Sequence, residues 1–379
     1  MLKNKRKIPL VLLAIGLALT PVYAFSSGGM QPAHLIFALL MLFAFGKNNI
    51  EFTKLSRLLL FLFVYTIFVE LFYGVIHSSV DQLINPLFIL FNLLLFTTVY
   101  IVINEYDLAA VRLGLFVATA IALISVLVSG VDLYGLQDEE RPVGTFNNPN
   151  QLGYFSTCVL SIAYLLRHHG YLNYLQALLL FLAALALSIF SLSKAAMIAN
   201  MAVILFAVAP KTRSGFVLFI LFMLPVVAYA LYQTLEAGTL DNFLFFRRID
   251  SMMDENDSSL SERGYFAFLE GNPLQILLGM GSENINKIVG HEVHSTFGSM
   301  LNYYGILGFI LFVGIYWHWA RSLYLAYGAV DAALILSPPT LYGIMHNGMR
   351  FTIFWFLVAI SYAMAQKTLR ASTLNGRRA

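Results

Sequence analysis

The chain has 379 residues, of which 59% are hydrophobic and only 11% are charged. Soluble domains contain roughly 45–50% apolar and about 25% charged residues, so this composition excludes an ordinary soluble protein. The net charge of +3 comes from scattered basic residues without a continuous patch, so no nucleic-acid partner is predicted. We expect an all-α, polytopic membrane protein embedded in a lipid bilayer.

Hydrophobic runs recur along the chain at close to the length of about 20 residues that one transmembrane helix requires. They predict a single membrane domain, 1–379, without a separate soluble domain. The twelve expected spans are 8–25, 32–46, 57–76, 85–104, 111–130, 151–167, 174–193, 195–210, 214–234, 297–319, 323–342 and 351–366. The basic start and Val22-Tyr23-Ala24 imitate a cleavable secretory signal, but we expect an uncleaved first span.

Lysines and arginines are distributed unequally between the two sides of this bundle. If the amino terminus is cytoplasmic, sixteen of the 23 basic residues lie on the inner side and seven on the outer side. Because positively charged loops are retained in the cytoplasm, both termini are predicted to be cytoplasmic.

The first long outer connection, 131–150, contains Arg141 and leads into a polar turn. The turn reads Gly144-Thr-Phe-Asn147-Asn-Pro149-Asn150-Gln-Leu-Gly153. We expect Asn150 to cap the sixth span after the turn at Pro149, and Gly153 to ease helix packing. A cap does not require Arg141. Its guanidinium is predicted to bind an anion, with a solvated loop charge as the alternative.

The second long outer connection, about 235–296, carries the main polar segment. Apolar residues at helical spacing over 243–253 predict an amphipathic helix at the membrane surface, where Arg247 faces either lipid headgroups or substrate. A second short helix is predicted over 260–270, ending at Gly271. Arg263 would lie in its first turn, where free N–H groups favour a phosphate; an ion pair with a neighbouring glutamate is the alternative.

His294 precedes the tenth span and is expected at its outer mouth. Histidine transfers protons near neutral pH, so we assign His294 to acid–base or substrate contact, with a solvated histidine as the alternative. The spacing of His291 and His294 imitates a metal pair. The nearby acids do not complete a ligand set, so neither a metal nor another cofactor is predicted.

Lys194, Arg350 and Glu70 are further candidates for substrate binding, together with Asn150 and Arg247. Lys194 at a tight outer turn either adds positive charge to the site or extends to the headgroups. Arg350 follows His346-Asn347-Gly348 on the outer face. Burying the Glu70 carboxylate within the third span costs on the order of 3 kcal/mol, so it either lines a polar cavity or reaches the outer surface.

Four of these segments, in this order, resemble the O-antigen polymerase and ligase superfamily of bacterial inner membranes. The matching segments are Arg141 to Gly153, Ser191-Leu-Ser193-Lys194, Ser261-Glu-Arg263 through Asn272-Pro273 to Gly279-Met-Gly281, and His294 through Gly305-Ile-Leu-Gly308. The resemblance covers roughly residues 111–320. Lys194 departs from the arginine that is usual in the family, and a lysine lacks the bidentate geometry for phosphate.

The resemblance implies metal-independent glycosyl transfer on the periplasmic side of the inner membrane, from an undecaprenyl-diphosphate-linked oligosaccharide to an acceptor glycolipid. Arg141 and Arg263 would hold the diphosphate, and His294 would activate or position the acceptor hydroxyl. A chain-length regulator is a further implied partner.

Two enzyme classes share these segments. We favour a repeat-unit polymerase of O-antigen, capsule or exopolysaccharide over a ligase that transfers glycan to lipid A-core, because the main outer loop is modest in length. The non-enzyme alternative is a lipid-linked oligosaccharide transporter or flippase. It is disfavoured because the polar residues gather in the outer loops and no two halves of the chain match.

Overall fold

The computed structural model describes residues 7–25, 29–46, 52–77, 83–129, 143–208 and 264–376, and every regular element among them is a helix. The all-helical class predicted from the sequence is therefore confirmed for this part of the chain. In chain order the elements are α2 (Ile8–Ala18), α3 (Pro32–Phe45), α4 (Lys54–His77), α5 (Ile84–Glu105), α6 (Ala109–Val128), α7 (Pro149–His168), α8 (Tyr174–Phe190), α9 (Lys194–Val208), the 3-10 helix η3 (Ala267–Glu270), α12 (Pro273–Leu278), α13 (Ser282–Val289), α14 (Thr296–Tyr327), α15 (Ala329–Met345) and α16 (Thr352–Gly376).

Five of the described helices are long and apolar enough to cross a membrane, namely Lys54–Ile76, Ile84–Glu105, Ala109–Val128, Thr296–Tyr327 and Thr352–Thr373. Five further apolar helices are shorter. These lengths and compositions are those of a helical membrane protein. The count of twelve spans and the cytoplasmic position of both termini stay predictions, and the expected span 214–234 lies outside the described residues.

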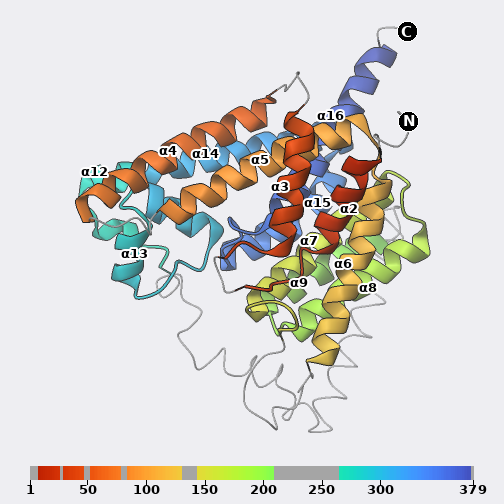
Figure 1. The fold of residues 1–379 in the computed structure, drawn as a ribbon, viewed down its shortest axis with the longest axis horizontal. Helices are drawn as coiled ribbons and strands as arrows, with labels where there is room; N and C mark the ends of the chain where they lie inside the picture. Colours follow the sequence, from red (N-terminus) through yellow and green to blue (C-terminus); the bar gives the residue numbers. More distant parts are fainter. Residues whose placement is uncertain are drawn as a thin grey trace.

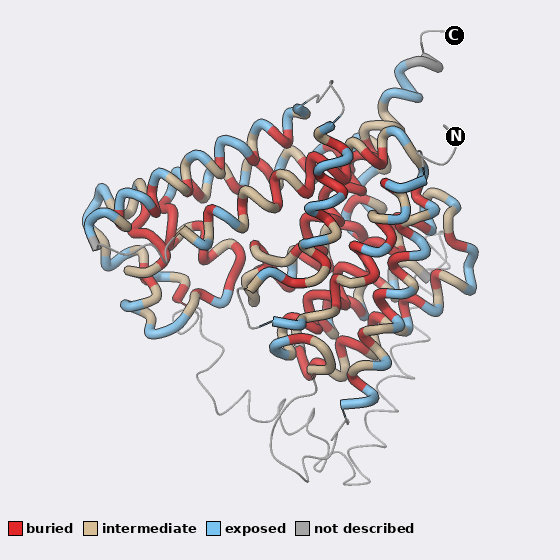
Figure 2. The backbone as a smooth tube through the Cα atoms, viewed as in Figure 1, coloured by how far each residue is buried: buried red, intermediate tan, exposed pale blue. Residues whose placement is uncertain are grey.

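Helix α16 lies at the centre of the bundle, where it packs against α5, α7 and α14. In the most apolar 18-residue stretch of α16, 78% of the residues are buried, whereas only 28% are buried in the corresponding stretch of α4. Figure 2 shows the difference as a largely buried centre and a much more exposed α4. Because Phe61, Phe68 and Val75 of α4 are exposed, this helix presents an apolar surface that suits lipid.

The helices form two groups that meet at α5, α14 and α16. Helices α4, α5 and α14 lie side by side and lead to the short helices α12 and α13, whereas α2, α3, α6, α7 and α8 pack on the other side (Figure 1). The beginning of α2 and the end of α16 lie at the same end of the bundle (Figure 1).

Several predicted span boundaries are wrong; α16, for example, continues to Gly376 and not to residue 366. Two of the differences have local reasons. Helix α2 ends at Ala18 and not at residue 25, and the chain turns at Thr20, whose hydroxyl donates to the carbonyl of Leu17. No break occurs between the tenth and eleventh spans at residues 320–322, where α14 continues to Tyr327. The chain breaks instead at Gly328, where φ is +83° and only glycine is unstrained.

The segment 264–295, which the sequence places on the outer side, folds onto α14. The second predicted loop helix is represented by a turn followed by η3, and it ends before Gly271 as expected. The amphipathic helix predicted over 243–253 lies outside the described residues. The backbone N–H of Phe268 donates to Asn302 Oδ1 at 2.7 Å, and Asn302 Nδ2 donates to the carbonyl of Tyr265 at 3.3 Å. These bonds attach the segment to α14.

Gly305 kinks α14 and receives the loop turn at Gly279. Gly305 has φ of +63° and Gly279 has φ of +98°, values that exclude most side chains. A Cβ atom on Gly305 would lie 2.4 Å from the backbone nitrogen of Gly279. Two of the segments on which the family resemblance depends are therefore in direct backbone contact.

Candidate functional site

A pocket of about 180 Å³ lies where the expected outer ends of several helices meet. Its walls come from the start of α3, from α5, from the start of α7, from the segment before α14 and from the connection between α15 and α16. The lining residues are Tyr23, Gly29, Gln31, His34, Phe88, Asn148, Asn150, Gln151, Glu292, His294, His346, Asn347, Arg350 and Phe351. The pocket therefore brings together His294, Arg350 and Asn150, three residues predicted from the sequence.

The start of α7 is built from the polar turn that the sequence singled out, with one correction. The N-cap of α7 is Asn148, whose side chain accepts from the backbone N–H of Gln151 at 2.9 Å, and not Asn150. The reason is Pro149, which holds the residue before it in an extended conformation and has no N–H to lose at the first helical position. Asn150 therefore lies inside the first turn and contributes to the pocket wall.

Tyr342 of α15 connects the start of α7 with the turn before α9. Its hydroxyl donates to the carbonyl of Asn150 at 2.9 Å and receives a bond from Ser193 Oγ at 3.4 Å. A Cβ atom on Gly153 would lie 2.8 Å from the same hydroxyl, so the predicted packing role of this glycine is confirmed. Leu192 in the turn has φ of +50°, a strained value for a non-glycine residue.

The segment that carries His294 is fixed against the segment that carries Arg350. Thr296 donates to the carbonyl of His346 through its N–H at 3.2 Å and through its hydroxyl at 3.0 Å. The same hydroxyl accepts from the N–H of Gly348 at 2.8 Å. Ser295 caps α14 by accepting from the N–H of Gly298 and also bonds the hydroxyl of Tyr265. The two walls consequently keep a fixed relative position.

Arg350 forms the charged centre of the pocket. Its Nη2 lies 3.1 Å from Glu292 Oε1, and its Nε and Nη2 donate to Asn85 Oδ1 at 3.1 and 2.6 Å. The Arg350 and Glu292 side chains are 28% and 38% exposed, so the ion pair remains open to water and contributes on the order of 1 kcal/mol or less to stability. Its guanidinium is oriented but reachable from the pocket.

Three histidines line the pocket, and their environments differ. The exposed His294 ring stacks on His291 with a centroid distance of 4.9 Å, while His346 stacks on Tyr342 at 4.5 Å. His34 Nδ1 accepts from the N–H of Gln31, and its Nε2 lies 2.8 Å from Thr352 Oγ1. Because Nδ1 accepts, the neutral His34 ring carries its proton on Nε2 and is held by both nitrogens. Of the three pocket histidines, only His294 is exposed, so it is the most accessible base.

Glu70 is not among the residues that line this pocket. Its carboxylate is fully buried and accepts from the N–H of Ser282 at 3.2 Å and from the hydroxyl of Tyr304 at 3.1 Å. The side chain of Asn85 also hydrogen-bonds this carboxylate. Glu70 was expected either to line a polar cavity or to reach the outer surface, and both expectations are wrong because the carboxylate is enclosed by its hydrogen-bond partners. It anchors the beginning of α13, where free N–H groups favour a negative charge.

Four predicted site residues fall where the structure gives no side chain. Arg141, Arg247 and Arg263 lie outside the described residues, and only the backbone of Lys194, at the start of α9, is described. Gly264, which follows Arg263, is buried, and a Cβ atom there would lie 3.1 Å from Val289. The roles of these four residues stay predictions.

Sequence reasoning missed two residues that line the pocket, Glu292 and His34, and one residue behind it, Asn85. Glu292 lies between His291 and His294, where the sequence gives no complete set of metal ligands and therefore no reason to single it out. His34 begins a predicted span, and an ionisable residue in such a run is a signal that could have identified it. Asn85 carried no comparable signal, since its importance comes from contacts with Arg350 and Glu70.

Among the described residues, no group of three or more histidine, cysteine or acidic side chains could hold a metal ion. The pocket instead offers a guanidinium paired with the Glu292 carboxylate, together with imidazoles, amides and aromatic faces. Guanidinium and imidazole groups can contact a phosphate, and amides and aromatic faces can contact a sugar. The sequence matches no protein-family model, and no curated protein matches it.

Proposed function

We propose that this protein transfers a glycan from an undecaprenyl-diphosphate carrier to an acceptor sugar on the periplasmic side of the membrane, as a repeat-unit polymerase. The supporting observation is the pocket that brings His294, Arg350 and Asn150 together from the starts of α14, α16 and α7. These residues lie far apart in the sequence, and their convergence at one end of the bundle is what a catalytic site requires.

The proposed reaction divides the work between a base and cations. His294 accepts the proton of the acceptor hydroxyl while the hydroxyl oxygen forms a bond to the anomeric carbon of the donor. The bond between that carbon and the diphosphate oxygen breaks, and its electron pair remains on the leaving diphosphate. General-base catalysis of this kind raises the reaction rate by about 10²–10⁴-fold. Fixed cations at the leaving group can lower the activation barrier by several kcal/mol.

Arg350 is the described cation best placed to contact the diphosphate. Glu292 occupies one edge of its guanidinium with two carboxylate oxygens, at 3.1 and 3.3 Å. A phosphate offers a similar pair of oxygens, so in our proposal a donor phosphate takes over this edge while Asn85 keeps the guanidinium oriented. Arg141 and Arg263 supply further positive charge in the proposal.

The size of the pocket bears on what it holds. Its volume of about 180 Å³ is below the roughly 300–1,000 Å³ of typical small-molecule sites. We infer that it accommodates the diphosphate and the reacting sugar, while the rest of the glycan and the lipid chain lie outside. Transfer to lipid A-core, as in a ligase, is the second candidate, because the same chemistry serves both acceptors.

The glycolipid profile of a strain that lacks this protein tests the proposal. A polymerase predicts loss of long chains with one repeat unit retained, whereas a ligase predicts accumulation of free lipid-linked polymer. Accumulation of repeat units that face the cytoplasm would contradict both and indicate a flippase. Complementation with wild-type protein and with His294→Ala, expressed at equal levels, connects the profile to the pocket.

A further inference from the structure

A second pocket, of about 500 Å³, lies at the other end of α5 and α16. Helix α5 contributes Phe88 to the first pocket and Asn104 to the second, so the two are separated by roughly 24 Å along the helix at 1.5 Å per residue. Helix α16 likewise continues to Gln366 and Arg370 in the second pocket. In the predicted orientation, the second pocket faces the cytoplasm.

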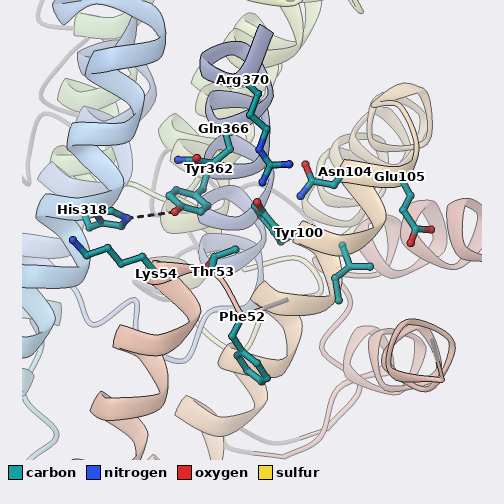
Figure 3. A pocket seen from close by; sticks show the side chains of 11 residues that line it. Phe52, Thr53, Lys54, Tyr100, Asn104, Glu105, His318, Tyr362, Gln366 and Arg370 are labelled. Carbon is teal, nitrogen blue, oxygen red and sulfur yellow. Dashed lines mark hydrogen bonds between the residues drawn. The ribbon is translucent and has the colours of Figure 1, made fainter. Parts of the chain in front are cut away.

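Basic and hydrogen-bonding side chains surround this second pocket. Figure 3 shows Arg370 beside Tyr100 and Asn104, and Lys54 on the opposite side beside His318. The lining contains a single acidic residue, Glu105, and its carboxylate points away from Arg370 in the same view. Lys54 and Arg370 therefore line the pocket from opposite sides, and no acidic side chain lies between them in this view.

The aromatic wall beside the two cations is closely packed. Tyr362 and Tyr100 are 3% and 6% exposed, and their rings pack with a centroid distance of 5.8 Å. His318 Nε2 lies 3.3 Å from the hydroxyl of Tyr362. Next to Gln366, the ammonium of Lys367 donates to the carbonyls of Ile103 and Tyr106, which fixes α16 to the end of α5. A ligand would meet a preformed surface.

The start of α4 adds a second source of positive potential. Lys54 is the first residue of this helix, and Thr53 Oγ1 accepts from the N–H of Ser56 at 3.0 Å as a cap. The remaining free N–H groups of the first turn and the helix dipole favour an anion at this end. A phosphate bound between Lys54 and Arg370 would be attracted by both positive charges and by the positive end of the α4 dipole.

We propose that this pocket binds the phosphate group of an anionic ligand, held between Lys54 and Arg370 with hydrogen bonds from the neighbouring tyrosine and amide groups. Two sources share this chemistry, the headgroup of an anionic phospholipid in the same leaflet and free phosphate. The position at the ends of the apolar helices α4 and α5 favours the headgroup.

The test uses the purified full-length protein in a neutral detergent. Short-chain phosphatidylglycerol, short-chain phosphatidylcholine and inorganic phosphate are titrated separately, and the shift in Tm gives an apparent Kd for each. The variants are Lys54→Gln and Arg370→Gln. Arg57→Gln is the matched control, because Arg57 is also an exposed cation of α4 but does not line the pocket. The Tm without ligand shows that each variant is folded.

We expect phosphatidylglycerol to bind more tightly than phosphatidylcholine, with affinity reduced at least about fivefold in Lys54→Gln and in Arg370→Gln but unchanged in Arg57→Gln. Saturation by millimolar phosphate with the same dependence on the variants would support the site and assign it to free phosphate. Equal losses in all three variants would indicate general attraction to charge and overturn the proposal, as would no loss in any of them.

Discussion

The hydroxyl of Tyr342 donates a hydrogen bond to the backbone carbonyl of Asn150 over 2.9 Å, although 192 residues separate the two in the chain. This bond joins the end of α15 to the first turn of α7. Because Ser193 also bonds the same hydroxyl, one side chain of α15 connects two segments that the sequence analysis singled out separately, Arg141 to Gly153 and Ser191 to Lys194.

We expect Tyr342→Phe to lower both stability and glycan transfer. The variant keeps the ring but leaves the buried connection between α7 and α15 without its hydrogen bonds, at a cost of about 1–3 kcal/mol. Tyr324→Phe is the control, since Tyr324 is 57% exposed. Tm and polymer chain length in a complemented strain are the measurements, and equal behaviour of the two variants would contradict a connecting role for Tyr342.

Arg350→Lys should be almost as damaging to transfer as Arg350→Ala. The planar guanidinium contacts Asn85 and Glu292 at the same time, and a lysine ammonium cannot reproduce this two-sided geometry. Polymer yield from purified protein is the readout, with Arg112→Lys as a control on the expected cytoplasmic side. Full activity of Arg350→Lys would reduce Arg350 to a source of general charge.

Gly348→Ala is predicted to destabilise the pocket, whereas Gly314→Ala is expected to be neutral or stabilising. A Cβ atom on Gly348 would lie 2.4 Å from the Tyr154 ring, while nothing lies within 4 Å of one on Gly314. Overpacking costs about 1–3 kcal/mol, and replacing a helical glycine with alanine gains up to about 1 kcal/mol. The measurement is the Tm of both variants in the same detergent, which should fall for Gly348→Ala and stay equal or rise for Gly314→Ala. An unchanged Tm for Gly348→Ala would be evidence against the packed arrangement.

Glu70→Gln should loosen α13 without unfolding the bundle. The amide offers one acceptor oxygen where the carboxylate offers two to Ser282, Tyr304 and Asn85, so we expect a loss of about 1–3 kcal/mol from these contacts. Amide hydrogen exchange over 280–289 should accelerate. Glu283→Gln, which removes a partly exposed ion pair with Lys287 on the same helix, is the control. Similar exchange in both variants would contradict the anchoring role.

The helices could largely be predicted from the sequence because apolar length is a strong signal, and α5 agrees with its expected span within one residue at each end. The boundary between α14 and α15 could not be predicted, because Ala320-Arg321-Ser322 permits a helix and the break occurs only at Gly328. The site was anticipated in part. His294 and Arg350 carry chemical signals, whereas the contacts of Glu70 and Asn85 depend on tertiary packing that no local pattern encodes.

Transfer by the purified protein, with a lipid-diphosphate-linked oligosaccharide as donor and a chelator present, tests the central claim most directly. We predict that wild-type protein extends the glycan, and that His294→Ala reduces turnover by about 10²–10⁴ while donor affinity stays close to normal. Weaker donor binding with partial rescue by His294→Arg would assign His294 to phosphate contact instead. Normal turnover of His294→Ala would remove it from the mechanism and contradict the account.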